Sequence, residues 1–138
     1  MKVTTYLNFP GNCAEALSFY EKNLGGKILT TMTFDSMPDP KMAPAGMEKK
    51  IMHARIMIGE TMLMASDGPK AEPMRSAYLT INTETTPEAE RIYKVLSEGG
   101  EVFMAMNETF FAHRFGQFRD KFGVNWMIIH EKPMPRPN

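Results

Sequence analysis

Hydrophobic and polar residues follow the same order twice along this chain. The first copy runs from a strand-like alternation at 6–9 through an amphipathic stretch to Gly25-Gly26, and then into apolar residues from 27. The second copy runs from a similar alternation at 78–81 through an amphipathic stretch to Gly99-Gly100, and then into apolar residues from 101. Alternation with a period of two predicts strands, and apolar residues three or four positions apart predict helices. The pattern therefore predicts two copies of a strand-helix-strand unit.

Capping signals mark the expected helices in both copies. Asn12, followed three positions later by Glu15, resembles a capping box, and Gly25 or Gly26 is suited to end the first helix in the left-handed conformation. In the second copy we expect Thr86 as the N-cap and Pro87 as the first helical residue. Both stretches are short and apolar on one side, which is typical of helices that cover a sheet.

Eight shorter patterns predict strands, at about 3–9, 27–34, 50–58, 61–66, 76–83, 101–106, 115–119 and 124–130. Each half then runs strand, helix and three strands, so the predicted class is α+β. We expect one domain made of two βαβββ modules, about 1–67 and 76–131, with a hinge at 68–75 and a frayed tail at 132–138. One helix cannot shield both faces of four strands, so the uncovered faces are expected to form a curved mixed sheet around a cavity.

Composition narrows the classes of function. The 138 residues hold 16 Lys and Arg against 16 Asp and Glu, so no net charge favours nucleic acid or an anionic membrane. No apolar run approaches the roughly 20 residues of a membrane-spanning helix, and we expect a cytoplasmic protein. The single cysteine, Cys13, excludes an intrachain disulfide and suits a reducing compartment. It stands at a helix start, where it is either a reactive thiolate or an inert packing residue.

Several segments resemble a known superfamily. Residues 6–16, 19–20 and 24–25 look like the opening of the vicinal oxygen chelate superfamily, which includes glyoxalases, bleomycin-resistance proteins and extradiol dioxygenases. Residues 53–54, 64–67, 108–116 and 120–128 are similar to its PhnB-like branch. The resemblance implies a glyoxalase-like fold and a homodimer, and it implies no particular reaction. Relatives also carry a 3-demethylubiquinone methyltransferase label, but no glycine-rich loop follows a strand here to hold a methyl donor.

The same resemblance allows a test for metal ligands. Metal-dependent members bind their ion through His, Gln or Glu on the first, fourth, fifth and eighth strands. The corresponding positions here fall at Thr5 or Tyr6, near Met64, at 76–78 and near Met127. Hydroxyl and thioether groups are poor ligands for a hard or borderline cation, so we expect no metal and no other cofactor. A divalent metal held elsewhere is the alternative.

Candidate catalytic residues are His53 and His113, with Glu108 near the second. A neutral imidazole near pH 7 is able to bind a metal or transfer a proton, but it is equally suited to a structural hydrogen bond. His130, near the expected end of the last strand, is predicted to be solvated surface. These interpretations stay open at the level of sequence.

Candidate ligand-binding residues are Tyr6, Met64, Arg114 and Trp126. The Arg114 guanidinium is suited to bind a carboxylate or phosphonate, or else pairs with a surface carboxylate. Trp126 either walls a pocket or fills the core. The favoured function is a dimeric protein that binds an unidentified small molecule without the superfamily's usual metal. The alternative is an enzyme, a lyase, isomerase or phosphonate-related enzyme, that uses His53 or His113 as a base or metal ligand.

Overall fold

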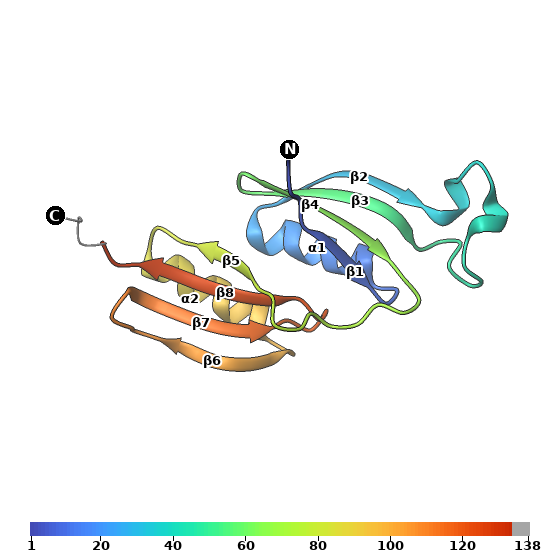
Figure 1. Ribbon diagram of the computed structural model, residues 1–138. Helices are drawn as coiled ribbons and strands as arrows, with labels where there is room; N and C mark the ends of the chain where they lie inside the picture. Colours follow the sequence, from blue (N-terminus) through green and yellow to red (C-terminus); the bar gives the residue numbers. More distant parts are fainter. Residues whose placement is uncertain (134–138) are drawn as a thin grey trace. The chain divides into compact units, whose positions relative to one another are not determined.

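Two units, each built from one helix and four strands, make up residues 1–133, the part of the chain that the computed structural model describes (Figure 1). The first unit is Met1–Glu72 and the second begins at Pro73. Among these residues no helix has the length and apolarity needed to cross a membrane. The predicted tail falls mostly at 134–138, which lies outside the described residues, and Lys132 donates its backbone N–H to the Phe111 carbonyl at 2.9 Å.

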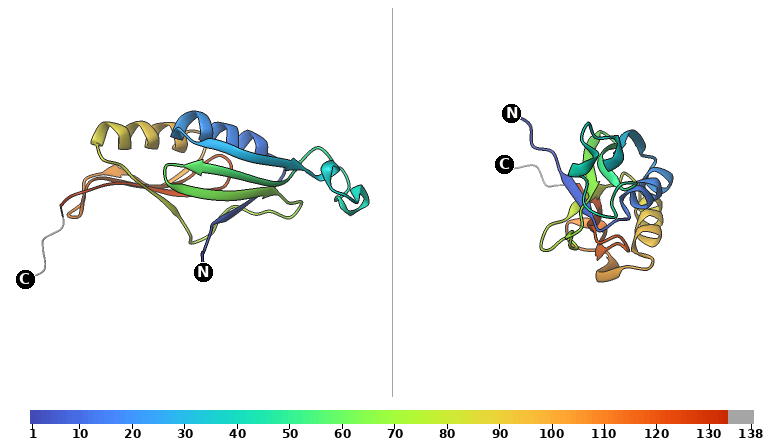
Figure 2. Two further views of the ribbon diagram at one scale, coloured as in Figure 1. Left: turned by 90° about the horizontal axis from the view of Figure 1, so that it is seen from above. Right: turned by 90° about the vertical axis from the view of Figure 1, so that its right-hand side faces the viewer.

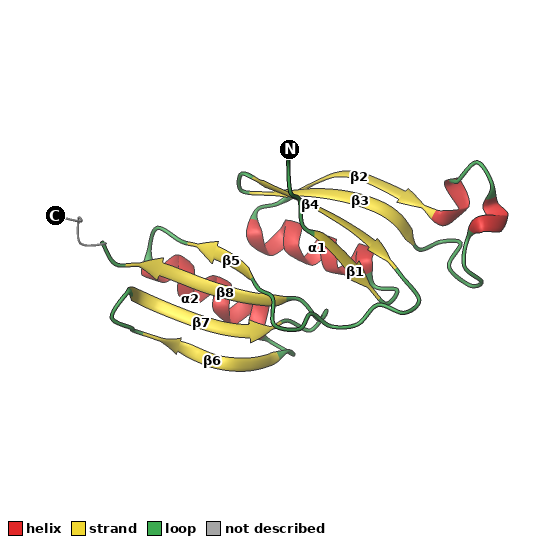
Figure 3. Ribbon diagram, viewed as in Figure 1, coloured by secondary structure: helices red, strands yellow, loops and turns green. Residues whose placement is uncertain are grey.

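The first unit contains β1 (Tyr6–Phe9), α1 (Cys13–Leu24), β2 (Lys27–Thr33), β3 (Ile51–Ile58) and β4 (Thr61–Asp67). Its strands lie in the order β1-β4-β3-β2, with β1 parallel to β4 and the other pairs antiparallel. Two short 3₁₀ helices, η1 (Phe34–Ser36) and η2 (Pro40–Met42), fall between β2 and β3 (Figure 3). Helix α1 covers one face of this sheet (Figure 2).

The second unit repeats this plan with β5 (Leu79–Asn82), α2 (Thr86–Ser97), β6 (Glu101–Asn107), β7 (Ala112–Arg119) and β8 (Asn125–Glu131). Its order is β5-β8-β7-β6, with β5 parallel to β8. The predicted α+β fold of two βαβββ modules is therefore confirmed. Each module forms a separate four-stranded sheet.

The start of α1 differs from the expected capping box. Helix α1 begins at Cys13, but the Asn12 side chain makes no capping hydrogen bond. The Cys13 N–H instead donates to Oδ1 of Asp67 at 2.9 Å, and Oδ2 of Asp67 accepts the Ile51 N–H at 2.9 Å. Because β1 and β4 are parallel, Phe9 and Asp67 lie at the same edge of the sheet, where β1 leads into α1. A residue distant in sequence thus caps the helix.

The start of α2 lies one residue earlier than expected. The N-cap is Thr85, whose hydroxyl accepts the Glu88 N–H at 3.3 Å, and the helix begins at Thr86. Thr85 and Glu88 have the spacing of a capping box, with Pro87 in the first turn. The prediction of Thr86 as N-cap was wrong because two adjacent threonines precede the proline.

Alternation along the strands separates the core from the opposite face in each unit. In the first unit, Leu7, Phe9 and Ile56 are buried with Leu17 and Tyr20 of α1. These side chains form the core between sheet and helix. The intervening residues of β1 and β3 point to the other face, which no helix of that unit covers.

Candidate functional site

The uncovered face of the first sheet carries a row of polar and thioether side chains. We call it the open face and define it by Tyr6, Met32, His53, Arg55 and Met64. In the strand registers Tyr6 is opposite Met64, Met64 is opposite Arg55, and His53 is opposite Met32. Four strands therefore contribute to one surface. Two of the predicted ligand-binding residues, Tyr6 and Met64, are direct neighbours on it.

Hydrogen bonds connect three members of the open face. The Tyr6 hydroxyl lies 3.1 Å from Nδ1 of His53, and the two ring centroids are 5.7 Å apart. The Arg55 Nε–H donates to Nε2 of His53 at 3.4 Å. Since Nε2 accepts from Arg55, Nδ1 carries the proton of a neutral His53 and donates it to the Tyr6 oxygen. The Tyr6 O–H is then directed away from His53.

The positive charge of the Arg55 guanidinium is available to a ligand. Within residues 1–133 no carboxylate lies within ion-pair distance of Arg55, which is exposed. Tyr6 is 42% exposed, and His53 is half-buried. A guanidinium, a phenol and an imidazole on one surface can donate several hydrogen bonds to a small oxygen-rich group.

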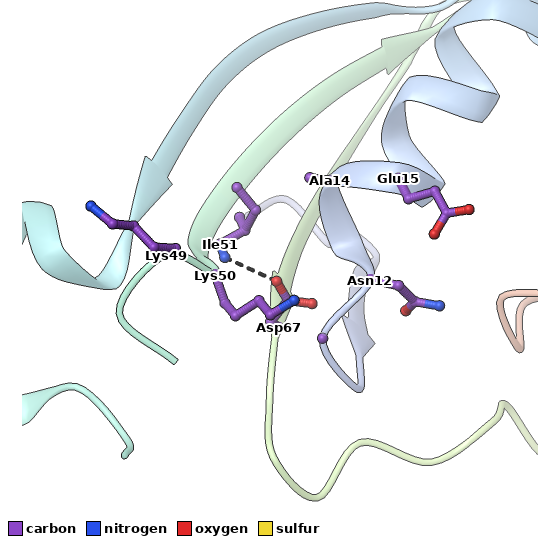
Figure 4. Close-up of a pocket in the computed structure, with 8 residues that line it drawn as sticks. Asn12, Ala14, Glu15, Lys49, Lys50, Ile51 and Asp67 are labelled. Carbon is purple, nitrogen blue, oxygen red and sulfur yellow. Dashed lines mark hydrogen bonds between the residues drawn. The ribbon is translucent and has the colours of Figure 1, made fainter. Parts of the chain in front are cut away.

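A second feature of the first unit is a pocket of about 400 Å³ at the start of α1 (Figure 4). Its lining is Gly11, Asn12, Ala14, Glu15, Lys49, Lys50, Ile51 and Asp67. Both oxygens of Asp67 accept backbone N–H groups, so this carboxylate serves the fold. Lys49 extends away from Asp67 in Figure 4 and pairs with Asp35 at 2.8 Å. Their hydrogen bond holds the pKa of Asp35 below its usual value. The pocket was not predicted.

Trp126 is placed in the core of the second unit. The side chain is 2% exposed, and its indole N–H donates to Oδ2 of Asp120 at 2.8 Å. Its partner across β7 and β8 is Phe118, whose ring contacts Tyr93 of α2 at 5.6 Å between centroids. Trp126 therefore lies on the helix-covered face of its sheet. Of the two interpretations from sequence, this position agrees with core packing.

Arg114 and Glu108 each have a charged partner. The Arg114 Nε lies 2.5 Å from Oε1 of Glu90 on α2, and an Arg114 amino group donates to the Met106 carbonyl at 3.3 Å. Glu108, in the turn between β6 and β7, pairs with Lys132 at 3.2 Å. Arg114 is thus paired within its own unit, whereas Arg55 has no carboxylate partner within residues 1–133.

His113 and His130 lie together at one end of the second sheet. Their ring centroids are 4.8 Å apart, and Nδ1 of His130 is 3.0 Å from the Thr86 hydroxyl oxygen. His113 is exposed and His130 is half-buried, so His130 is not the solvated residue that was expected. His53 belongs to the first unit and is not part of this pair.

Cys13 is fully buried. Burial, and then the negative charge of Asp67, raise the pKa of its thiol to about 12. The helix N-terminus therefore does not produce a reactive thiolate, because Asp67 already occupies it. The structure supports the inert interpretation of Cys13.

The donor set does not fit the metal of the superfamily's usual site. Tyr6 and Met64 stand opposite each other in the first sheet, and Met127 pairs with Thr80 in the second. In the described part of the chain, no group of three His, Cys, Asp or Glu side chains is arranged to hold an ion.

Comparison with known proteins places these features in a family. Protein YjdN of Escherichia coli (strain K12) is 35% identical over 145 aligned residues, covering 98% of this chain and 99% of that protein. The crystal structure of protein PA1353 from Pseudomonas aeruginosa matches with a TM-score of 0.85 and 40% identity, over 96% of this chain and 99% of that one. A putative 3-demethylubiquinone-9 3-methyltransferase, PhnB protein, from Bacillus cereus matches with a TM-score of 0.80 and 25% identity, over 94% and 99%.

A more distant match concerns the fold alone. The fosfomycin resistance protein FosX from Listeria monocytogenes has a TM-score of 0.63 at 10% identity, over 96% of this chain and 93% of that one. With the paired βαβββ modules, it defines the chain as a vicinal oxygen chelate fold protein. Residues 1–129 match the family described as 3-demethylubiquinone-9 3-methyltransferase. The chain belongs to this PhnB-like family, as the sequence resemblance predicted.

Sequence reasoning missed Arg55, the contact of Thr86 with His130, and the pairing of His113 with His130. Arg55 was detectable, because it stands two positions after His53 on one strand and so shares its face. The contacts of His130 with Thr86 and His113 join residues far apart in sequence, so no local sequence pattern predicts them.

Proposed function

We propose that this protein binds a small molecule through an anionic, oxygen-rich group on the open face of the first unit. The observation that carries the proposal is the hydrogen-bonded series Tyr6–His53–Arg55. Arg55 supplies a positive charge without a carboxylate partner in residues 1–133, and Tyr6, which is 42% exposed, supplies a hydroxyl. Met32 and Met64 border the series with flexible apolar surface, which adapts to the rest of a ligand.

The proposed binding needs no metal and no organic cofactor. Its donors are the hydroxyl, imidazole and guanidinium groups of the chain itself. Affinity is therefore expected to be the same before and after treatment with a chelator. We also propose that the protein acts as a homodimer, since apolar residues are exposed on the edge strand β6.

Methylphosphonate and acetate are suitable probes for this site. A ligand that binds only the native state at 100 times its Kd stabilises it by about 2.7 kcal/mol, which is measurable as a rise in Tm. We expect a concentration-dependent rise with at least one of the two probes, and we expect Arg55→Gln to abolish it. Arg75→Gln, which changes an exposed arginine of the second unit, is the matched control.

A clear result would reject the proposal. If neither probe raises the Tm at millimolar concentration, or if Arg55→Gln retains the full rise, the open face is not an anion site. If Arg75→Gln loses the rise to the same extent, the effect is general electrostatic attraction.

The second candidate function is an enzyme in which His53 acts as a general base. It is favoured by the hydrogen bond between His53 Nδ1 and the Tyr6 hydroxyl, which fixes the ring. Nε2 would be the base, once Arg55 turns from it to the anionic group of the substrate. The same surface would bind the substrate, with Arg55 holding an anionic group. If the wild type consumes methylphosphonate or acetate and His53→Gln does not, the protein catalyses a reaction in addition to binding.

A further inference from the structure

An irregularity in the second sheet brings two histidines together. Along β7 and β8, Ala112 is opposite Glu131 and Arg114 is opposite His130, so His113 is the extra residue of a β-bulge. A bulge changes the direction of a side chain relative to the regular alternation. His113, near the start of β7, consequently lies against His130, near the end of β8. The two strands are neighbours in the sheet (Figure 1).

The spacing of the two rings fits a shared metal ion. With about 1.2 Å from ring centroid to nitrogen and about 2.1 Å from nitrogen to a zinc-like ion, two bound imidazoles have centroids roughly 4.6 to 5.3 Å apart at octahedral to tetrahedral angles. The observed separation is 4.8 Å. The planes are tilted by 44°, so the rings are not stacked face to face.

Thr86 supplies the supporting contact that such a site requires. Ligating histidines commonly donate the second ring N–H to a nearby oxygen, which fixes the tautomer. The Thr86 hydroxyl lies 3.0 Å from Nδ1 of His130. With Nδ1–H donating to Thr86, Nε2 of His130 carries the free lone pair.

Charge and access at this end of the sheet permit a cation. Arg114, opposite His130 in the register, is neutralised by Glu90 at 2.5 Å. His113 is exposed, which gives an ion a route from solvent. Two imidazoles leave further coordination positions for water or for an oxygen donor of a ligand.

We propose that His113 and His130 form a binding site for a divalent transition metal ion such as Zn²⁺, with Thr86 as the positioning residue. The site lies wholly in the second unit. It is independent of the open face and of the binding function proposed for it.

Titration calorimetry with ZnCl₂ on tag-free protein tests this site, at about pH 7.5 where imidazole is mostly neutral. We expect one ion per chain in the wild type. Loss of an outer partner typically weakens metal binding roughly 10- to 100-fold, so Thr86→Val is expected to weaken it about tenfold and His113→Gln or His130→Gln more strongly. His53→Gln, the change at the third histidine, is the matched control and should bind like the wild type.

The choice of an exposed residue guards against misfolding as an explanation. His113 is exposed, so His113→Gln is expected to retain the fold, which far-UV circular dichroism checks independently. The proposal is overturned if the wild type takes up no Zn²⁺ at millimolar concentration. It is equally overturned if His113→Gln binds as tightly as the wild type, or if His53→Gln weakens binding as much as His113→Gln does.

Discussion

At the scale of single residues, the environment of a side chain decides its chemistry more than its position in the sequence does. Cys13 begins a helix, where a thiolate is usually favoured. It is fully buried beside the carboxylate of Asp67, and both effects oppose ionisation. The protonated thiol is therefore the form that the native state stabilises.

This burial predicts a loss of stability at alkaline pH. The thiol pKa is 9.0 ordinarily and about 12 in the native state. Below pH 9, the pKa of the thiol in the unfolded chain, the buried thiol makes its full contribution to the stability of the native state. Above that pH the unfolded chain ionises and gains free energy while the native thiol stays protonated, so stability falls as pH rises from 9 toward 12.

Comparison with Cys13→Ala isolates this effect from other alkaline titrations. Between about pH 7.5 and pH 10.5 the wild type should lose roughly 2 kcal/mol more unfolding free energy than the variant. Urea denaturation at the two pH values measures the difference. Parallel losses in both proteins would show that the thiol titrates alike in the folded and unfolded states.

At the scale of elements, a single carboxylate joins one helix to two strands. Asp67 ends β4, accepts the N–H of Cys13 at the start of α1, and accepts the N–H of Ile51 at the start of β3. Its side chain is buried, with 4% of its surface exposed. The relative placement of these three elements depends on this one residue.

Removal of that carboxylate should destabilise the first unit. Asp67→Ala leaves two buried N–H groups without an acceptor, and we expect a loss of about 2–4 kcal/mol in unfolding free energy. Asp67→Asn retains one acceptor oxygen and should lose less. The control is Asp39→Ala, which removes an exposed carboxylate that accepts the Lys41 N–H at 3.1 Å. We expect this control to change the free energy of unfolding by about 0.5 kcal/mol or less. Equal losses at Asp67 and Asp39 in denaturant titrations would contradict this role.

At the scale of the whole molecule, the proposed homodimer has a candidate surface on β6. This edge strand exposes Val102, Phe103 and Met104, each by more than 40%. Exposed apolar edges of this kind are prone to pair with another chain. The proposal therefore places contacts between copies on this strand.

A charge on β6 should disrupt this association. We expect light scattering to give twice the chain mass for the wild type at micromolar concentration, and the single chain mass for Met104→Lys. Met42→Lys, at a 70% exposed methionine in the connection between β2 and β3, should leave the mass unchanged. A wild-type monomer, or a dimeric Met104→Lys protein, would exclude β6 as the contact.

Much of the architecture was predictable because its signals are local. The helix face of Leu17 and Tyr20, the glycines after α1, and the alternation of β1 and β3 each arise within a few residues, so the βαβββ order could be read from sequence. The family was recognised separately, from the resemblance of segments such as 6–16 and 108–116 to its members. The helix caps were harder to predict from the sequence. The acceptor for Cys13 is 54 positions away, and the choice between two adjacent threonines depended on backbone geometry.

The candidate sites were predictable only in part. Tyr6, Met64 and His53 were candidates from sequence, and the structure places all three on one face of the first sheet. Their role in binding stays a prediction. Arg114 and Trp126 are residue types suited to bind ligands. In the structure, however, Arg114 pairs with Glu90 and Trp126 is buried in the core.

The sequence by itself determined the duplicated modules and the strand and helix periods, because these depend on spacing along the chain. It also indicated the family, through the resemblance of whole segments to known members. Only the tertiary structure decided that Arg114 pairs with Glu90, which carboxylate caps α1, and that a bulge places His113 against His130. These are contacts between residues distant in sequence, and strand register and side-chain burial fix them. The second half of the repeat thus has the same plan as the first but a different set of polar side chains available for chemistry.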